Sequence, residues 1–397
     1  MGFIKVVKVF YKKLSESNAL DQCSTQEEKD FYEPVYRLLY ISGFSLHDTS
    51  FGYRAYSMFG KVMVGMFVTS ELWFLVDCRT LNDLVASVSV SIINVLAIYR
   101  YWHMVRNELF KKISKTMNSQ NFDISTRQRR DIVKSWIKRN NLYFKLVIIV
   151  ASSTVIVWNF KPLLDNTEYN LVVQLHIPFK FDTPSRYPLV YMFTSLTFNY
   201  SAYFVIANDL VMQTLLIHLI CQFNVLADCF ENVVKECAIK KGEKIQFFYF
   251  TYFEKRFCNL IDQHSSLLSC TEELRNTLKY PMLGQLVSSA FLICFAAYQV
   301  TAVNIVTFIT SVLYLIYNLI ELLIFCRWCD EIRIQSLNIR EAVYCCGWEL
   351  ALLRSPGARG MLQFVIARAT KPLVLNAGGI WDISLASYAF VSDCFLN

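Results

Sequence analysis

Seven long apolar stretches constrain this chain more than any other feature of its sequence. A bilayer core about 30 Å thick needs about 20 apolar helical residues, whereas β-strands usually end by about eight residues. Hydrophobic residues make up 54% of the 397 residues and charged residues 18%, against about 25% in a typical soluble domain. The sequence therefore predicts an all-α membrane protein with seven transmembrane helices, at roughly residues 58–77, 83–102, 142–160, 188–220, 282–303, 305–326 and 373–396. The fourth stretch is too long for one crossing, so we expect its helix to continue beyond the membrane.

The positive charges lie almost entirely on one side of these stretches. Of the 39 Lys and Arg residues, 33 fall in the N-terminal segment and in the loops after the second, fourth and sixth stretches, and only four fall in the other loops. An excess of Lys and Arg marks the cytoplasmic side of a membrane protein. We therefore expect a cytoplasmic N-terminus and an extracellular C-terminus, the reverse of a G-protein-coupled receptor. The net charge of +7 follows from this topology, so no nucleic-acid partner is expected.

Two cytoplasmic segments are patterned as helices rather than as loops. One apolar stripe, at alternating steps of four and three, consists of Phe253, Phe257, Leu260, His264, Leu267, Thr271, Leu274 and Leu278. Residues 339–353 are also helical in pattern but too short to span, and we expect 355–357 (Ser-Pro-Gly) to end that helix. These segments predict a cytoplasmic helical anchor layer, which packs either within the chain or between subunits.

The expected organisation follows from the spans and the charges. It comprises a cytoplasmic N-terminal segment (1–57), transmembrane helices one to four (58–220), a cytoplasmic helical loop (221–281), transmembrane helices five and six (282–326), a cytoplasmic anchor helix (327–372) and a seventh transmembrane helix (373–397).

Catalytic and cofactor motifs are missing from the sequence. It contains no GxxxxGK[ST] phosphate loop, no GxGxxG after a strand, no HExxH and no GxSxG, and its five His residues are scattered. We therefore expect neither an enzyme nor a cofactor or metal site.

Several polar residues lie inside the expected spans, where ionisable groups are costly and often functional. They include Glu71 in the first span, Asp209 in the fourth, and Asn318 and Glu321 in the sixth. Asn318 and Glu321 are three residues apart and so share one face of a helix. We expect such groups to form hydrogen bonds between helices that hold the bundle together.

The outer halves of the second, third, fourth and sixth spans have the composition of a ligand pocket. They mix aromatic and aliphatic residues with a few hydroxyl groups, as sites for small, mostly apolar ligands do. The candidate ligand-binding residues are Ser89, Ser153, Thr154, Trp158, Tyr191, Phe193, Thr197, Tyr200, Phe308, Ser311 and Tyr314. The hydroxyl groups and the Trp158 indole N–H can each supply one directional hydrogen bond. The alternative is ordinary helix packing with aromatic residues at the membrane interface.

The last span carries a small, acidic face. Asp382, Ala386, Ala389 and Asp393 follow one another at steps of four, three and four, while Ser384, Tyr388, Val391 and Phe395 form the bulkier opposite face. A ring of such acidic faces around a water-filled axis favours cations. The same face can instead pack on a neighbouring helix, so pore lining by these four residues is one of two interpretations.

Residues 341–390 carry a family signature. Its positions are Ala342, Tyr344 and Trp348, the pairs Lys371–Pro372 and Ala377–Gly378, and Ser384–Leu385 followed by Tyr388. In these residues the chain resembles insect odorant receptors, and its length, span count and orientation are similar to theirs. The TYxxxxxQF ending that is usual in the related gustatory receptors is absent.

The resemblance implies a subunit of a ligand-gated, non-selective cation channel in the plasma membrane of olfactory sensory neurons. Such channels are heterotetramers of a variable tuning subunit and a shared co-receptor, and they pass monovalent and divalent cations. A small apolar volatile binds in the outer half of one subunit's bundle, cytoplasmic helix ends form the main subunit contacts, and the last helix lines the pore. This chain resembles the tuning subunit, because residues 221–281 lack the long insertion of the co-receptor. The family's last helix usually runs several residues further than Asn397, where this chain ends.

Two other classes of function are weighed beside the channel. A metabotropic seven-helix chemoreceptor is disfavoured by the orientation and by the lack of an NPxxY-like element in the last span. A small-molecule transporter would show internal repeats and helices broken at mid-membrane. The sequence shows no repeat, and Gly378–Gly379 is its nearest feature to a break.

Overall fold

The computed structural model describes residues 17–21, 23, 25–45, 47–78, 81–106, 122–164, 169–241, 246–302, 305–349 and 356–396. Its helices are α2 (Asn18–Asp21), α3 (Gln26–Ser42), α4 (Phe51–Asp77), α5 (Leu81–Arg106), α7 (Arg127–Leu164), α8 (Tyr187–Lys241), α9 (Gln246–Ala302), α10 (Ile305–Tyr344), α12 (Pro356–Ala369) and α13 (Leu385–Leu396). Two short strands, β1 (Asn376–Ala377) and β2 (Trp381–Asp382), pair antiparallel. The all-α fold class is therefore confirmed.

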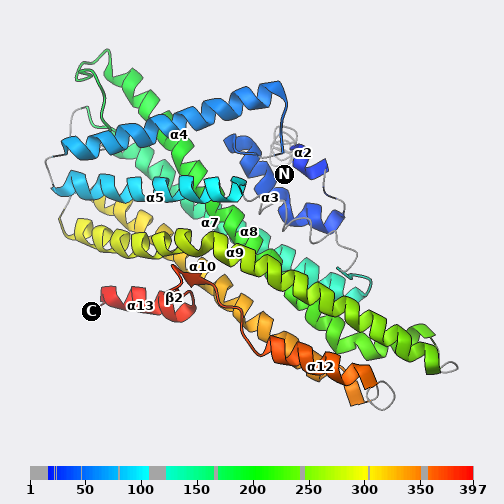
Figure 1. The fold of residues 1–397 in the computed structure, drawn as a ribbon. Helices are drawn as coiled ribbons and strands as arrows, with labels where there is room; N and C mark the ends of the chain where they lie inside the picture. Colours follow the sequence, from blue (N-terminus) through cyan, green and yellow to red (C-terminus); the bar gives the residue numbers. More distant parts are fainter. Residues whose placement is uncertain are drawn as a thin grey trace, which may run out of the picture.

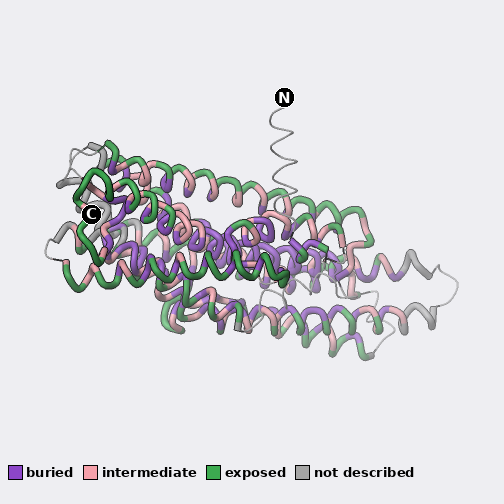
Figure 2. Tube along the Cα trace, turned by 90° about the horizontal axis from the view of Figure 1, so that it is seen from above, coloured by how far each residue is buried: buried purple, intermediate pink, exposed green. Residues whose placement is uncertain are grey.

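The helices form one elongated bundle around α8 (Figure 1). This helix contacts α3, α4, α5, α7, α9 and α10, and the apolar window within it is wholly buried. A helix that is apolar on every side is stable only when neighbours surround it. The buried interior of the bundle in Figure 2 follows from this arrangement, with the exposed residues on the outer helix faces.

Four of the described helices, α4, α7, α8 and α10, are long and apolar enough to cross a membrane. The 55 residues of α8 and the 57 residues of α9 would each extend about 80 Å at 1.5 Å per residue, more than twice the thickness of a bilayer core. The prediction that the fourth helix continues past residue 220 is confirmed, because α8 ends only at Lys241.

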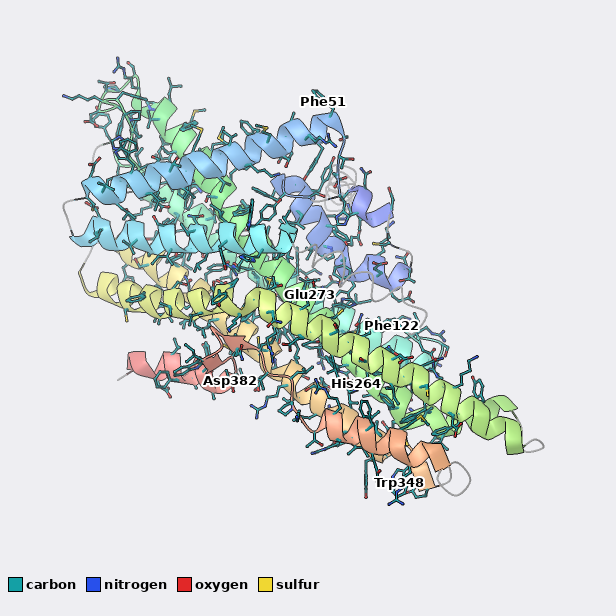
Figure 3. The ribbon with its side chains drawn as sticks, viewed as in Figure 1. Phe51, Phe122, His264, Glu273, Trp348 and Asp382 are labelled. Atoms are coloured by element: carbon teal, nitrogen blue, oxygen red, sulfur yellow. The ribbon has the colours of Figure 1, made fainter. Side chains whose placement is uncertain are left out.

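The predicted cytoplasmic stripe is buried within the chain. Its members, Phe253, Phe257, Leu260, His264, Leu267, Thr271, Leu274 and Leu278, are all at most 4% exposed. They lie on α9, which joins the predicted cytoplasmic loop and the predicted fifth span in one helix. This helix faces α8 through ring contacts of Phe230 with Phe257 and His264 (Figure 3). Burial, with a smaller contribution from the charge of Arg368, lowers the pKa of His264 to about 4. His264 is therefore a neutral packing residue at physiological pH.

The described part of the predicted helix 339–353, residues 339–349, differs from the sequence prediction, and residues 350–353 lie outside the described residues. The helix of the sixth span runs unbroken to Tyr344, and Gly347, with φ of +81°, follows in the left-handed conformation that other residues rarely adopt. Pro356, which was expected to end a helix, instead begins α12. Proline suits the first helical position because that residue's N–H would have no partner there in any case. The anchor segment is thus built from the end of α10 and a separate helix, α12, which packs on α10.

The last apolar stretch also differs from the prediction, because it is helical only from Leu385 onward. A turn from Ala377 to Ile380 closes the β1–β2 hairpin, with φ of +64° at Gly378 and +79° at Gly379. A tight turn with two positive φ angles requires glycine at these positions. The expected helix over 373–396 was therefore wrong for its first half, and α13 alone would extend about 18 Å, less than a bilayer core.

Candidate ligand-binding site

A cavity lies between α4, α5, α7, α8 and α10, and we call it the inner cavity. Its volume is about 80 Å³, counted as the space open to the centre of a water molecule. The lining is mostly apolar and aromatic: Phe67, Val90, Ile93, Asn94, Ala151, Thr154, Val155, Trp158, Phe198, Ser201, Ala202, Val205, Ile206, Tyr314 and Tyr317. Such a lining suits a small, mostly apolar ligand.

Trp158 supplies the inner cavity with an unused hydrogen-bond donor. Its ring stacks on Phe198, with centroids 5.7 Å apart and planes within 5°, and its centroid lies 5.4 Å from that of Tyr314. These contacts hold the indole plane in place. The indole Nε1 is buried and has no hydrogen-bond partner among the described residues. A buried donor without a partner costs about 1–3 kcal/mol, so an acceptor atom on a ligand would relieve this cost.

Three other polar side chains of the inner cavity already have partners. Ser201 Oγ donates to Asn94 Oδ1 over 2.5 Å, and Asn94 Nδ2 donates to the backbone oxygen of Val90 over 3.1 Å. Thr154 Oγ1 donates to the backbone oxygen of Val150 over 3.0 Å. These groups are engaged within the protein, whereas the Trp158 N–H has no partner in the part of the chain that the structure describes, so Trp158 is the natural contact for a polar atom of a ligand.

Tyr317 joins the inner cavity to a buried ion pair. Its ring lines the cavity, and its hydroxyl donates to Asp209 Oδ2 over 3.1 Å. Asp209 also pairs with Arg100 Nη1 at 2.7 Å, and both side chains are less than a tenth exposed. Glu321 accepts a hydrogen bond from Gln285 Nε2 over 2.8 Å. These contacts link α5, α8, α9 and α10, so the expected interhelical bonding of Asp209 and Glu321 is confirmed.

The predicted ligand-binding residues divide into four groups. The inner cavity is lined by Thr154, Trp158 and Tyr314, and a second cavity near the start of α8 is lined by Phe193 and Thr197. Of the others, four are buried or half-buried but line neither cavity (Ser89, Tyr191, Tyr200 and Ser311), and two are exposed (Ser153 and Phe308). The outer halves of whole helices cannot face one cavity, because neighbouring residues such as Ser153 and Thr154 point about 100° apart on a helix. Ser153 and Phe308 therefore lie on the outside of the bundle, contrary to the expectation that they face a pocket.

Several residues of the inner cavity were not predicted from the sequence. Phe67 belongs to α4, a helix that the predicted pocket left out, and Asn94, Ser201 and Tyr317 lie deeper than the outer halves that were considered. Asn94 offered a signal, because an amide inside an apolar span needs a partner within the bundle. Phe67 offered none, since an apolar residue in an apolar span is ordinary.

The small face of the last helix is uncovered in the single chain. Ala386, Ala389 and Asp393 are exposed, whereas Tyr388 and Val391 of the bulkier face pack against the core. Asp382 lies on β2, before the helix begins, so it does not continue the helical face as predicted (Figure 3). Pore lining by these residues stays a prediction.

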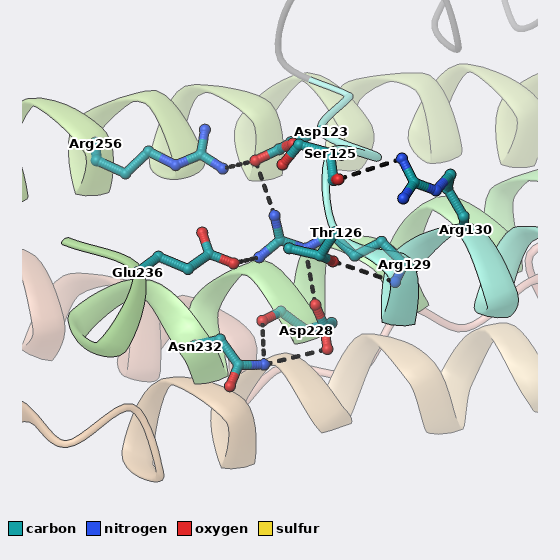
Figure 4. Close-up of polar contacts among 9 residues, drawn as sticks. All are labelled: Asp123, Ser125, Thr126, Arg129, Arg130, Asp228, Asn232, Glu236 and Arg256. Atoms are coloured by element: carbon teal, nitrogen blue, oxygen red, sulfur yellow. Dashed lines mark hydrogen bonds and ion pairs between the residues drawn. The ribbon is translucent and has the colours of Figure 1, made fainter. Parts of the chain in front are cut away.

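A buried cluster of charges ties α7, α8 and α9 together (Figure 4). Arg129 of α7 is fully buried and donates to Asp228 over 2.7 Å, to Asp123 over 2.8 Å and to Glu236. Arg256 of α9 donates to the same Asp123 carboxylate. Burial alone would raise the pKa of Asp123, but hydrogen bonds from Ser125 and the charges of the two arginines outweigh it and hold that pKa below its ordinary value. The cluster fastens α7, α8 and α9 to one another.

Comparisons with known proteins agree with this architecture. A family model described as 7tm Odorant receptor matches residues 80–393. Odorant receptor 67a of Drosophila melanogaster is 25% identical over 276 residues, and the match covers 65% of this chain and 64% of that receptor, just under two thirds of its length. Odorant receptor 13a of the same fly is 20% identical over 85% of this chain and 84% of the receptor. The odorant receptor coreceptor of Aedes aegypti is 23% identical over 33% of this chain and 27% of its own length.

The solved structures show the same fold. The insect olfactory receptor OR5 from Machilis hrabei superposes with a TM-score of 0.78 and 17% identity, over 93% of this chain and 96% of the receptor. The same receptor in complex with eugenol superposes with a TM-score of 0.78, over 94% and 97% of the two chains. The arrangement is that of a seven-transmembrane, all-α receptor and not of an enzyme. Because the family model covers most of its length, the chain belongs to the 7tm odorant receptor family.

Proposed function

We propose that this chain is the odorant-binding, tuning subunit of a ligand-gated, non-selective cation channel, and that it assembles with a shared co-receptor as a heterotetramer. The observation that carries the proposal is the inner cavity, with its apolar lining and the unpartnered Trp158 Nε1. These features favour a small, mostly apolar volatile with one hydrogen-bond acceptor. Eugenol, which is in complex with the related OR5 receptor in one of its structures, is mostly apolar and has two oxygens that can accept a hydrogen bond, so it is a suitable first probe.

Ligand binding would act by shifting a closed–open equilibrium, which requires a higher affinity for the open state. A tenfold difference in affinity supplies about 1.4 kcal/mol. Tyr317 supports α10 as the responding element, because its ring faces the inner cavity and its hydroxyl bonds Asp209. The same helix contacts α13. In this proposal the exposed face of α13, with Ala386, Ala389 and Asp393, borders the path of monovalent and divalent cations, and the Asp382 hairpin lies beside it.

The orientation and location of the chain belong to the same proposal. The bias of Lys and Arg supports a cytoplasmic N-terminus and an extracellular C-terminus. The long ends of α8, α9 and α10 with α12 would then form a cytoplasmic anchor layer, held by the Arg129 cluster. The chain would reside in the plasma membrane of olfactory sensory neurons, with the bilayer around its apolar helices.

The test is whole-cell current during a panel of volatiles that begins with eugenol. The chain is expressed alone and together with an odorant co-receptor, and its presence at the cell surface is measured in both cases. A rapid cation current in the paired cells and not in the cells with this chain alone is the expected result. A response carried by a second messenger without direct current would indicate a metabotropic receptor, and uptake of volatile without current would indicate a transporter. Either outcome would overturn the channel assignment.

A further inference from the structure

A second cavity lies above the inner cavity, and we call it the outer cavity. It is bounded by α4, by the first part of α8 and by the segment 175–179 of the loop between α7 and α8. Its volume, measured in the same way, is about 400 Å³, against about 80 Å³ for the inner cavity. The outer cavity is therefore the roomier of the two and is large enough to receive the same class of small molecule.

The roof of the outer cavity is fastened to α4. His176 N–H donates to the backbone oxygen of Ser70 over 3.2 Å, and Ser70 Oγ donates to the backbone oxygen of His176 over 2.7 Å. The His176 ring stacks on Trp73 at 5.1 Å, and its Nδ1 lies 3.1 Å from Asp77 Oδ2. Leu175 beside it is buried. These contacts fasten the loop segment over the last turns of α4 and so cover that end of the outer cavity.

The side of the outer cavity has an apolar rim. The exposed residues that line it are Met66, Pro178, Phe179, Leu189 and Phe193. In a seven-transmembrane receptor, exposed apolar side chains near the outer ends of α4 and α8 face the outer leaflet. An apolar volatile concentrates in the hydrocarbon region, because transfer of apolar surface out of water is favourable. The rim therefore opens toward the phase in which such a ligand accumulates.

Phe67 separates the two cavities. It is 1% exposed, lines both cavities, and its ring centroid lies 6.1 Å from that of Phe198. Phe67 is ten residues from the end of α4, and Phe198 is eleven residues from the start of α8, so both lie about 15 Å below the outer helix ends at 1.5 Å per residue. Phe67 therefore stands where the linings of the two cavities meet.

We propose that the outer cavity is an antechamber through which a small apolar ligand passes from the outer leaflet to the inner cavity, with Phe67 as the partition between them. The inference rests on the proposed function, because it takes the inner cavity as the final binding site. A substitution in an antechamber changes the free-energy barrier to ligand entry and exit. It does not change the free energy of the ligand bound in the inner cavity. A change at its rim must therefore alter the rates of ligand entry and exit by the same factor, and leave the equilibrium affinity unchanged.

Two rim variants test the proposal in opposite directions. Met66→Trp narrows the rim and should slow current activation at low ligand concentration and deactivation after washout, each at least threefold. Phe193→Ala widens the rim and should speed both. The concentration for half-maximal current should stay within twofold of the parent value in each case. The probe is eugenol, or the volatile of the panel that first gives a current.

Matched controls lie on the same helices but do not line the outer cavity. Val62→Trp changes a residue of α4 that is 46% exposed, like the 45% of Met66, and Leu196→Ala changes a residue of α8 that is 43% exposed, like Phe193. Both controls should leave the two rates unchanged. Surface expression of all four variants is measured with the currents, so that a variant that fails to fold does not enter the comparison.

The outcomes separate this inference from the proposed function. Currents with parent kinetics in both rim variants would overturn the antechamber while leaving the channel assignment intact. A shift in half-maximal concentration that equals the change in deactivation rate would also overturn it, because the rim would then act on the bound state. Ser70→Ala removes a hydrogen bond that holds the roof. If the two rim variants leave the rates of activation and deactivation unchanged and Ser70→Ala speeds both rates, the ligand enters from water, and the lateral route is refuted. A lack of current in the parent pair would instead contradict the proposed function.

Discussion

Trp158→Phe tests whether the indole N–H is the group that recognises a polar atom of the ligand. The variant keeps an aromatic ring against Phe198 and removes a donor that is buried and unpartnered among the described residues. A hydrogen bond between neutral groups contributes about 0.5–1.5 kcal/mol net. Its loss should raise the half-maximal concentration of a ligand with an acceptor about 2- to 12-fold, since 1.4 kcal/mol corresponds to a factor of ten.

The change from Trp to Phe also alters packing, so a single ligand cannot isolate the hydrogen bond. The assay compares an aliphatic methyl ketone with the alkene in which a methylene group replaces the carbonyl oxygen. The two molecules share their shape, and the loss of packing is common to both. The ketone should lose affinity by the factor above relative to the alkene, as in a double-mutant cycle.

Two results would refute this reasoning. An equal shift for ketone and alkene would mean that Trp158 acts by shape alone. A changed preference among cations with an unaltered dose response would place Trp158 at the permeation path instead of the ligand site. Trp102→Phe is the control, because this tryptophan is 63% exposed on α5 and should affect neither ligand.

Three further predictions concern the pore, the anchor layer and the hairpin. Asp393→Asn should lower permeation of divalent relative to monovalent cations severalfold. An unchanged permeability ratio, calculated from the shift in reversal potential between the two kinds of cation, would refute the pore assignment. Arg129→Met should destabilise the detergent-solubilised chain by about 3–5 kcal/mol, measured by thermal unfolding, because it leaves buried carboxylates without their cation. Because folding lowers the pKa of Asp123, its ionised carboxylate stabilises the fold at a pH above the unfolded-state pKa of about 3.9, and this stabilisation is lost as the pH falls through the folded-state pKa. The difference in stability between the parent and Arg129→Met should therefore narrow below about pH 4. Gly378→Ala, at φ +64°, should lower the unfolding temperature by imposing a left-handed conformation that costs about 1–2 kcal/mol, whereas Gly360→Ala on α12, where an added Cβ meets nothing within 4 Å, should not.

The parts of the fold that depend on local periodicity could be predicted. The stripe from Phe253 to Leu278 is buried throughout, because one face of a long helix must find a partner whatever that partner is. The prediction of one helix over 373–396 was wrong because it rested on composition. Its apolar composition fits a span, but Gly378 and Gly379 at positive φ turn the chain before the helix begins. Apolar composition indicates that a segment can be buried in an apolar environment. It does not show where the backbone turns, because that depends on the backbone conformation at each residue.

The candidate site could be predicted only in part, because a cavity is the space that neighbouring helices leave between them. Thr154, Trp158 and Tyr314 were found, since aromatic and hydroxyl residues in an apolar span stand out. Phe67 was missed because its role depends on which face of α4 meets α8. Arg100 was missed as the partner of Asp209 because it lies at the end of its span and was counted with the loop charges. Both roles depend on helix contacts that are far apart in sequence.

In the proposed channel, the geometry of the inner cavity would separate recognition of the ligand from the response of α10. Trp158 offers a donor that no described residue uses, so a ligand can bond it without breaking any contact within the protein. Tyr317 is different, because its hydroxyl already bonds Asp209, the partner of Arg100. A hydrogen bond to a buried charged group contributes about 1.5–3 kcal/mol, which corresponds to a factor of about 10 to 150 in an equilibrium constant. A ligand that displaces the Tyr317 ring must therefore either move Asp209 and the helices it joins or supply that energy from its own contacts. This makes the Tyr317–Asp209 bond the place where occupancy of the cavity can become a movement of α10.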